Sequence, residues 1–137
     1  MLTEKIKQAL SLLSTPLIVD SMEELGLKEY LLEPEFRPIV PYSKIIGTAI
    51  TVQIERTNKN EEANLNFLSK AYETTHNVRN PIISISVPDS LSKSSIFGSV
   101  ASVRAQMNGF SGALIGGSVR DTQELIKSNF PIFSNSI

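Results

Sequence analysis

The sequence of 137 residues contains no cysteine and no tryptophan, and its charges nearly cancel. The absence of cysteine excludes disulfides, zinc–thiolate sites, iron–sulfur clusters and thiol nucleophiles. Thirteen basic and 14 acidic residues give a net charge of −1. Proteins that bind nucleic acid usually carry a clustered basic surplus, and because none is present here we expect no direct nucleic-acid binding.

The chain also lacks long apolar runs. No stretch approaches the ~20 apolar residues that a membrane-spanning helix needs. The start, MLTEKIKQAL, has neither the apolar core nor the small-residue cleavage site of a signal peptide. We therefore expect a cytoplasmic protein without a membrane partner. A content of 41% hydrophobic and 20% charged residues is typical of a globular protein, and the length fits one domain over residues 1–137.

Helix and strand signals alternate along the chain. Helical spacing predicts helices over residues 3–13 and from Thr15 to just before Gly26, followed by a proline-rich extended connector over 33–41. The remaining predicted elements, in order, are a strand over 46–54, a helix over 61–75, a buried strand over 82–87, a serine-rich loop over 89–95, a helix through Val100, Val103 and Met107 that ends at Gly109, a strand over 113–115, a Gly116-Gly117 turn, a helix over 121–127 and an extended segment from Phe130. This alternation predicts α/β architecture with a sheet that is at least partly parallel.

The last extended segment lies close to the C-terminus, so the predicted sheet looks incomplete. Two explanations are open at this point. A partner chain completes the sheet, or the chain is a shortened version of a longer domain.

The first candidate site is the segment GGSVRDTQE at residues 116–124. It follows a predicted buried strand and opens a predicted helix, and α/β proteins bind ligands at this edge of the sheet. Helical spacing would put Asp121 and Glu124 on one face, with Arg120 one turn before Glu124. One guanidinium and two carboxylates suit a hard divalent cation beside an anionic substrate. The alternative is an ordinary helix start with acidic residues favoured by the helix dipole and a surface ion pair.

The second candidate is the helix start around Gly98 to Ala101. Free backbone N–H groups at such a position can hold a carboxylate or phosphate, and a glycine allows a ligand to approach the backbone. The alternative is a glycine near a helix start with no ligand. The only histidine, His76, lies in a polar context and is expected to be a solvent-exposed residue at a helix end.

Taken in order, several segments resemble the RraA-like family, which contains the regulator of ribonuclease E activity and class II pyruvate aldolases acting on 4-hydroxy-4-methyl-2-oxoglutarate. The segments are 13–22 (LSTPLIVDSM), 25–26 (LG), 46–52 (IGTAITV), 98–101 (GSVA), 109–113 (GFSGA), 117–121 (GSVRD) and 131–133 (PIF). Their order and spacing carry the resemblance, which spans nearly the whole chain.

The resemblance implies a swivelling β/β/α domain with a mixed sheet and flanking helices, assembled into trimers or hexamers with the site between neighbouring chains. It also implies roles for particular residues. The substrate carboxylate would bind at Gly98, Ser99, Val100 and Ala101, the pyruvate portion at Arg120, and Mg²⁺ or Mn²⁺ at Asp121, with Glu124 acting through water. Arg120 and Asp121 would be the catalytic residues.

The activity implied is a metal-dependent aldolase for small 2-oxo acids, and the same chemistry would serve oxaloacetate decarboxylation. The alternatives are a non-catalytic, protein-binding regulator of ribonuclease E and RNA processing, or a shortened inactive relative. The sequence departs from the family pattern in three places. Ser99 stands where many members have Glu or Asp, Gly116 stands where Asp is usual, and the chain ends soon after residues 131–133, whereas the family continues.

Overall fold

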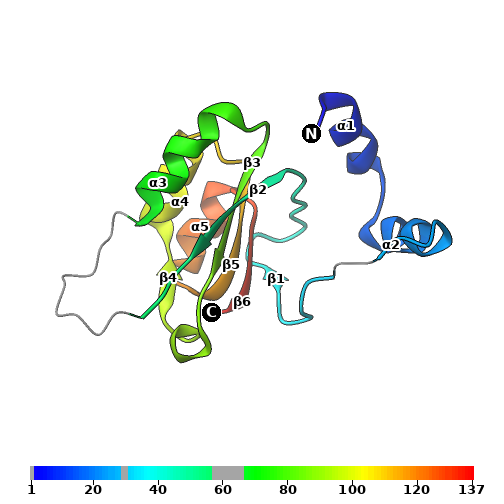
Figure 1. Ribbon diagram of the computed structural model, residues 1–137. Helices are drawn as coiled ribbons and strands as arrows, with labels where there is room; N and C mark the ends of the chain where they lie inside the picture. The colour runs from blue at the N-terminus through cyan, green and yellow to red at the C-terminus, as the bar shows by residue number, and fades with distance from the viewer. Residues whose placement is uncertain (1, 29–30, 57–66) are drawn as a thin grey trace.

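A computed structural model describes residues 2–28, 31–56 and 67–137 (Figure 1). The helices are α1 (Glu4–Leu12), α2 (Thr15–Glu24), α3 (Phe67–Glu73), α4 (Ser99–Met107) and α5 (Thr122–Ser128), with short 3₁₀ turns at Thr74–Asn77 and Asp89–Leu91. The strands are β1 (Arg37–Pro38), β2 (Thr48–Gln53), β3 (Pro81–Ser86), β4 (Ser95–Phe97), β5 (Gly112–Val119) and β6 (Ile132–Ser136).

The strands form one mixed sheet in the order β1-β6-β5-β3-β2, with the short β4 also paired to β5. Strand β1 is antiparallel to β6, and the other pairs are parallel. The mixed sheet with flanking helices confirms the expected α/β class.

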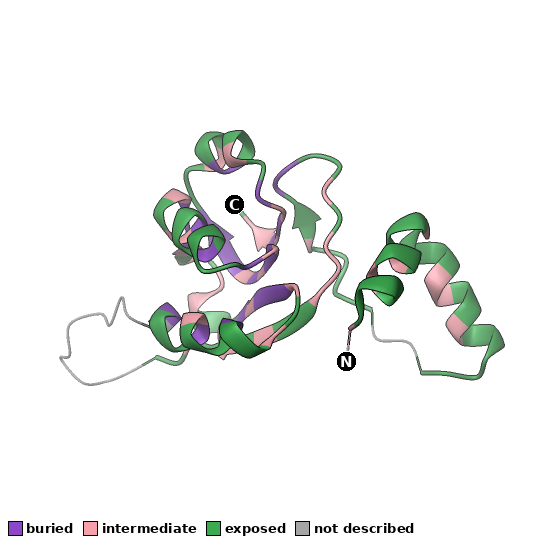
Figure 2. Cartoon of the chain, turned by 90° about the horizontal axis from the view of Figure 1, so that it is seen from above, coloured by how far each residue is buried: buried purple, intermediate pink, exposed green. Residues whose placement is uncertain are grey.

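Apart from the short β4, the parallel strands are added to the sheet one beside the next, in the order in which they occur along the chain. Strands β2, β3, β5 and β6 are neighbours in sequence order, and α3, α4 and α5 make the three crossovers. Because parallel crossovers are right-handed, a sheet wound in one direction carries all of its crossover helices on one face. The views from the side and from above agree with this arrangement (Figures 1 and 2). The same winding brings the carboxyl ends of the parallel strands to one edge.

The core lies between the sheet and helices α3, α4 and α5. The register aligns Ile50, Ile83 and Ala113 in one row across the sheet. Ile83 and Ala113 are fully buried and pack in one cluster with residues of all three helices, among them Leu68 and Leu125. Alternate β2 residues are half-buried on this side, whereas Thr51 on the opposite face is exposed. The buried apolar residues are therefore concentrated on the helix-covered face.

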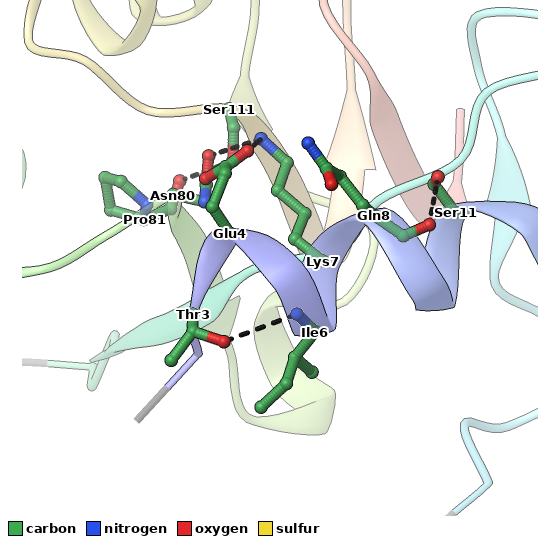
Figure 3. Close-up of polar contacts among 9 residues, drawn as sticks. All are labelled: Thr3, Glu4, Ile6, Lys7, Gln8, Ser11, Asn80, Pro81 and Ser111. Carbon is green, nitrogen blue, oxygen red and sulfur yellow. Dashed lines mark hydrogen bonds and ion pairs between the residues drawn. The ribbon is translucent and has the colours of Figure 1, made fainter.

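Residues 2–28, here called the arm, stand apart from this core. Neither α1 nor α2 contains a buried residue, and Figure 2 shows both helices in the colours of exposed and half-buried residues. Lys7 Nζ donates to Asn80 Oδ1 at 2.6 Å and lies 4.0 Å from Glu4 Oε1 (Figure 3). Lys44 Nζ donates to the carbonyls of Leu10 (2.9 Å), Ser11 (3.0 Å) and Leu13. Lys7 and Lys44 thus each link the arm to the rest of the described chain by hydrogen bonds.

Two glycine predictions concern helix ends, and both are confirmed. Gly26 and Gly109 adopt positive φ after α2 and α4, as expected for residues that terminate helices. Helix α2 begins at Thr15, and the residue that caps it is Ser14, whose hydroxyl accepts from the Leu17 N–H at 3.4 Å; a cap at Thr15, which the Thr15-Pro16 sequence also suggests, is not formed.

The predicted Gly116-Gly117 turn is wrong, because both glycines lie within β5. A Cβ at Gly116 would stand 2.9 Å from the carbonyl oxygen of Ile85 on β3. Glycine is needed there because two strands approach closely, not because the chain turns. The predicted serine-rich loop over 89–95 does not lead directly into a helix, because the unpredicted strand β4 begins at Ser95 and pairs with β5.

Helix α4 presents a different face from the one its apolar pattern predicts. Val100, Val103 and Met107 are 66%, 51% and 81% exposed, whereas Ser102 and Ala105 are fully buried. Small side chains allow the helix to lie close to the sheet, and this places the larger ones outside.

Only part of the predicted helix over 61–75 can be assessed, because residues 61–66 lie outside the described chain. The rest forms α3 and a 3₁₀ turn, Thr74–Asn77, in which His76 is exposed as expected. None of the described helices combines the length and apolarity that a membrane crossing requires.

Candidate active site

Two chain segments meet at the carboxyl edge of the sheet. Gly98 and Ser99 follow β4 and begin α4, whereas Arg120 and Asp121 follow β5 and precede α5. The Arg120 N–H donates to the carbonyl of Phe97 at 3.0 Å, which continues the pairing of β4 with β5 beyond the strands. This bond brings the start of α4 next to the start of α5.

The Asp121 carboxylate is bound by the first residue of α4. Its Oδ2 accepts the Ser99 backbone N–H at 3.1 Å and the Ser99 hydroxyl at 2.9 Å. Arg120 Nε lies 4.0 Å from the same oxygen. The backbone hydrogen bond from Ser99, its hydroxyl hydrogen bond and, to a smaller extent, the Arg120 charge hold the pKa of Asp121 below its ordinary value. The carboxylate is therefore ionised at neutral pH.

Asp121 precedes α5 in the left-handed conformation, with φ 57° and ψ 41°. Its carbonyl accepts the Leu125 N–H at 2.9 Å, which starts the helix, but Asp121 is not a helical residue. The predicted helical pair of Asp121 and Glu124 on one face is therefore wrong. Glu124 lies exposed in the first turn of α5, and within the described chain no hydrogen bond or ion pair joins it to Arg120 or Asp121.

The side chains of Arg120 and Asp121 pack closely against Gly98. A Cβ at Gly98 would stand 2.9 Å from both Arg120 Cγ and Asp121 Oδ2. The absence of a side chain at position 98 therefore has a structural explanation, since a Cβ there would push the side chains of Arg120 and Asp121 away. The Arg120 side chain is 71% exposed, so its guanidinium can meet a ligand from solvent.

The first turn of α4 is only partly free to bind an anion. The Ser99 N–H is already bound to Asp121, whereas the Val100 and Ala101 amides have no acceptor one turn earlier within the helix. Beside this turn lies a shallow, open depression of about 330 Å³ lined by Ser99, Val100, Val103 and Arg104. The structure thus brings together Gly98, Ser99, Arg120 and Asp121, and leaves Glu124 outside the group.

The donor set decides which metals could bind. No group of three or more His, Cys, Asp or Glu side chains gathers anywhere in the described ranges. A closed site for zinc or calcium is therefore not formed by these residues. Mg²⁺ usually keeps several waters and takes only one or two protein carboxylates, with further oxygens from the substrate. Asp121, 38% exposed, fits that requirement.

Sequence reasoning missed the contact between Ser99 and Asp121. The residues are 22 positions apart, and nothing in their local patterns signals a hydrogen bond. The only available signal was topological, because both follow strands that end at the same edge of the sheet.

The sequence profile of the RraA-like family, described as Aldolase/RraA, matches residues 15–137. The chain belongs to the RraA-like family. This confirms the family inferred from the order of the sequence segments.

Solved structures agree on the fold. An uncharacterized protein from Pseudomonas syringae pv. tomato str. DC3000 superposes with a TM-score of 0.74 at 23% identity, covering 98% of this chain. The RNA-processing inhibitor RraA from Thermus thermophilis gives a TM-score of 0.62 at 17% identity over 86% of the chain. A structure titled as novel cellulases from gut-associated microbes gives 0.67 at 21% identity over 90%.

The chain of this RraA-like protein spans 57%, 54% and 65% of the Pseudomonas, gut-microbe and Thermus chains, respectively. At these identities the likeness concerns the fold. Curated protein sequences give no significant match.

Proposed function

We propose that this RraA-like protein is a divalent-metal-dependent aldolase for small 2-oxo acids of the 4-hydroxy-4-methyl-2-oxoglutarate type, with oxaloacetate decarboxylation as a second activity. The observation that carries the proposal is the convergence of Arg120, Asp121 and the first turn of α4 at one edge of the sheet. An exposed guanidinium, an ionised carboxylate and free amides are what a 2-oxo acid and a hard cation require.

In the proposed reaction, the planar guanidinium of Arg120 binds the substrate carboxylate and 2-oxo oxygen, and the Val100 and Ala101 amides orient the carboxylate. Retro-aldol cleavage breaks the bond between the hydroxyl-bearing carbon and the carbon adjacent to the 2-oxo group. The hydroxyl proton passes to solvent as its carbon becomes a carbonyl, and the electron pair of the broken bond forms an enolate with negative charge on the 2-oxo oxygen. Protonation of the enolate carbon from solvent then gives pyruvate. Arg120 stabilises this charge, since a fixed donor is most effective where charge develops. A bound Mg²⁺ or Mn²⁺ would supply polarisation of the carbonyl group. Asp121 would hold the ion, with Glu124 in reach only through water.

We also propose that the protein works as a homo-oligomer, a trimer or hexamer. The exposed apolar side chains of Val100, Val103 and Met107 support this, because a row of such residues on one helix is typical of a protein interface. The row lies next to the candidate site on α4.

The test is pyruvate release from oxaloacetate with and without Mg²⁺ or Mn²⁺. We expect metal-dependent release in the wild type and a loss of about 10²–10³-fold in Arg120→Ala, the scale of removing one donor to a developing oxyanion. Arg120→Lys should not restore activity, because lysine is a point charge without the bidentate fork. Arg79→Ala, at an exposed position outside the site, is the matched control.

Absence of metal-dependent release in the wild type would favour the second candidate, a non-catalytic regulator that binds ribonuclease E. The likeness to the Thermus structure titled as an RNA-processing inhibitor supports this candidate, as does the exposed apolar row on α4. A binding measurement between this chain and ribonuclease E would test it directly.

A further inference from the structure

Ser99 contacts Asp121 through two different atoms. Its backbone N–H and its hydroxyl both donate to Oδ2, at 3.1 and 2.9 Å. Two donors on one oxygen fix both the position and the rotation of the carboxylate. Within the described chain the other oxygen, Oδ1, has no hydrogen-bond partner.

No other described group hydrogen-bonds this carboxylate. Asp121 occupies the position before α5, yet its side chain makes no hydrogen bond to the first turn of that helix. Arg120 Nε, at 4.0 Å, contributes charge without a hydrogen bond. The left-handed backbone at Asp121 and the missing side chain at Gly98 leave the space in which the contact to Ser99 forms.

We propose that Ser99 is a positioning residue that holds Oδ2 and thereby presents Oδ1 of Asp121 to a divalent cation. The nature of the ligand rests on the proposed function, whereas the role of Ser99 rests on the observed contact. Groups that hydrogen-bond a metal-binding side chain orient it, and their removal commonly lowers metal affinity 10–100-fold. The backbone N–H at position 99 is kept when alanine, threonine or cysteine replaces serine, so we expect the loss of the hydroxyl to have an effect at the lower end of that range.

The experiment is a titration of the protein with Mn²⁺, followed by the electron paramagnetic resonance signal of the free ion, which reports binding independently of turnover. We expect Ser99→Ala to weaken Mn²⁺ binding about 10-fold. Ser99→Thr, which keeps the hydroxyl, should bind close to the wild type. Asp121→Asn should lose most of the affinity, and Ser92→Ala, which removes a hydroxyl bonded only within its own loop, should not change it.

The outcomes separate this inference from the proposed function. Unchanged affinity in Ser99→Ala with affinity lost in Asp121→Asn would overturn the role of Ser99 and leave the metal site standing. Equal affinity in the wild type and Asp121→Asn, or no Mn²⁺ binding by the wild type, would overturn the metal site and the role of Ser99 with it. Circular dichroism checks folding, and if Ser99→Ala unfolds, Ser99→Cys provides a similar size with a much weaker donor.

Discussion

The α/β body and the arm of this RraA-like protein are held in place by different forces. Ile83 in the body is 0% exposed, whereas Leu12 in the arm is 87% exposed. Full burial of an Ile or Leu side chain contributes about 1.5–3 kcal/mol to folding, but exposed ion pairs contribute about 0–1 kcal/mol. The body is therefore stabilised by its own core, whereas α1 and α2 have no buried residue and are linked to the body by polar contacts that include those of Lys7 and Lys44.

This difference predicts that the two regions open separately. Elements with few buried apolar contacts unfold locally at lower free energy than the core of the same protein. We expect the arm to leave the body while the sheet and α3–α5 remain folded. Substitutions at positions 83 and 12 and at Lys44 test the comparison, and a substitution at Tyr72 probes the core of the body alone.

The largest effect is expected from Ile83→Ala, which empties a site at the centre of the core. The free energy of unfolding should fall by about 3–4 kcal/mol, through lost burial and the cavity that remains. The matched substitution in the arm, Leu12→Ala, should change it by less than about 0.5 kcal/mol. Urea denaturation measures both. If Ile83→Ala does not fold, Ile83→Val should cost about 1 kcal/mol. Equal effects at positions 83 and 12 would contradict the comparison.

A smaller effect is expected from Lys44→Met, which removes the ammonium bound to the last carbonyls of α1. The loss should be local and about 1 kcal/mol, because these hydrogen bonds are solvent-exposed. Hydrogen exchange should accelerate in residues 4–13 and stay unchanged in β3 and β5. Lys70→Met, at an exposed position on α3, is the control. Slower or unchanged exchange in α1 would show that Lys44 does not fasten the arm.

The smallest effect concerns Tyr72, whose ring packs edge-on against Phe110 with the ring centres 5.8 Å apart. Its hydroxyl is buried and has no hydrogen-bond partner among the described residues, and burial raises the pKa of this tyrosine. Tyr72→Phe keeps the ring and removes the unpaired oxygen, so stability should rise by up to about 1 kcal/mol.

The pH dependence of stability gives a second measurement of the same substitution. The unfolded chain releases the Tyr72 proton near pH 10, before the folded protein does. Wild-type stability should therefore fall as pH rises above about 10, and Tyr72→Phe should fall less steeply. If the Tyr72 hydroxyl is hydrogen-bonded in solution, Tyr72→Phe should lower the stability instead of raising it, and that outcome would contradict the prediction.

The sequence predicted β2 and β3 well because their burial follows their pattern. Ile50 and Val52 alternate with exposed residues on β2, and Ile82, Ile83 and Ile85 form the apolar part of β3. Gly116 misled the prediction because a glycine required for close strand approach looks the same in sequence as a glycine required for a turn. The exposed face of α4 was missed because helical periodicity shows where apolar residues gather, and not whether the chain itself covers them.

For the site, the sequence indicated Arg120 and Asp121 from their place after a buried strand and from the family resemblance. The link between Ser99 and Asp121 depends on β4, which was not predicted, and on the left-handed backbone at Asp121. A tertiary contact of this kind follows from the packing of distant strands. No local pattern around Ser99 carries that information.

The pairing of β1 with β6 has a consequence for how the protein folds. Arg37 lies opposite Ser134, and the Ile39 N–H donates to the carbonyl of Ile132 at 2.8 Å, so these contacts join segments far apart in sequence. Closing so long a loop lowers the entropy of the chain before the contacts that stabilise the closed loop can form, and folds rich in such distant contacts form slowly. The parallel strands β3 and β5 can assemble around α4 without this closure. We therefore expect β1 to join the sheet late, with the Ile39 amide protected after the amides of β3 in pulse-labelled hydrogen exchange.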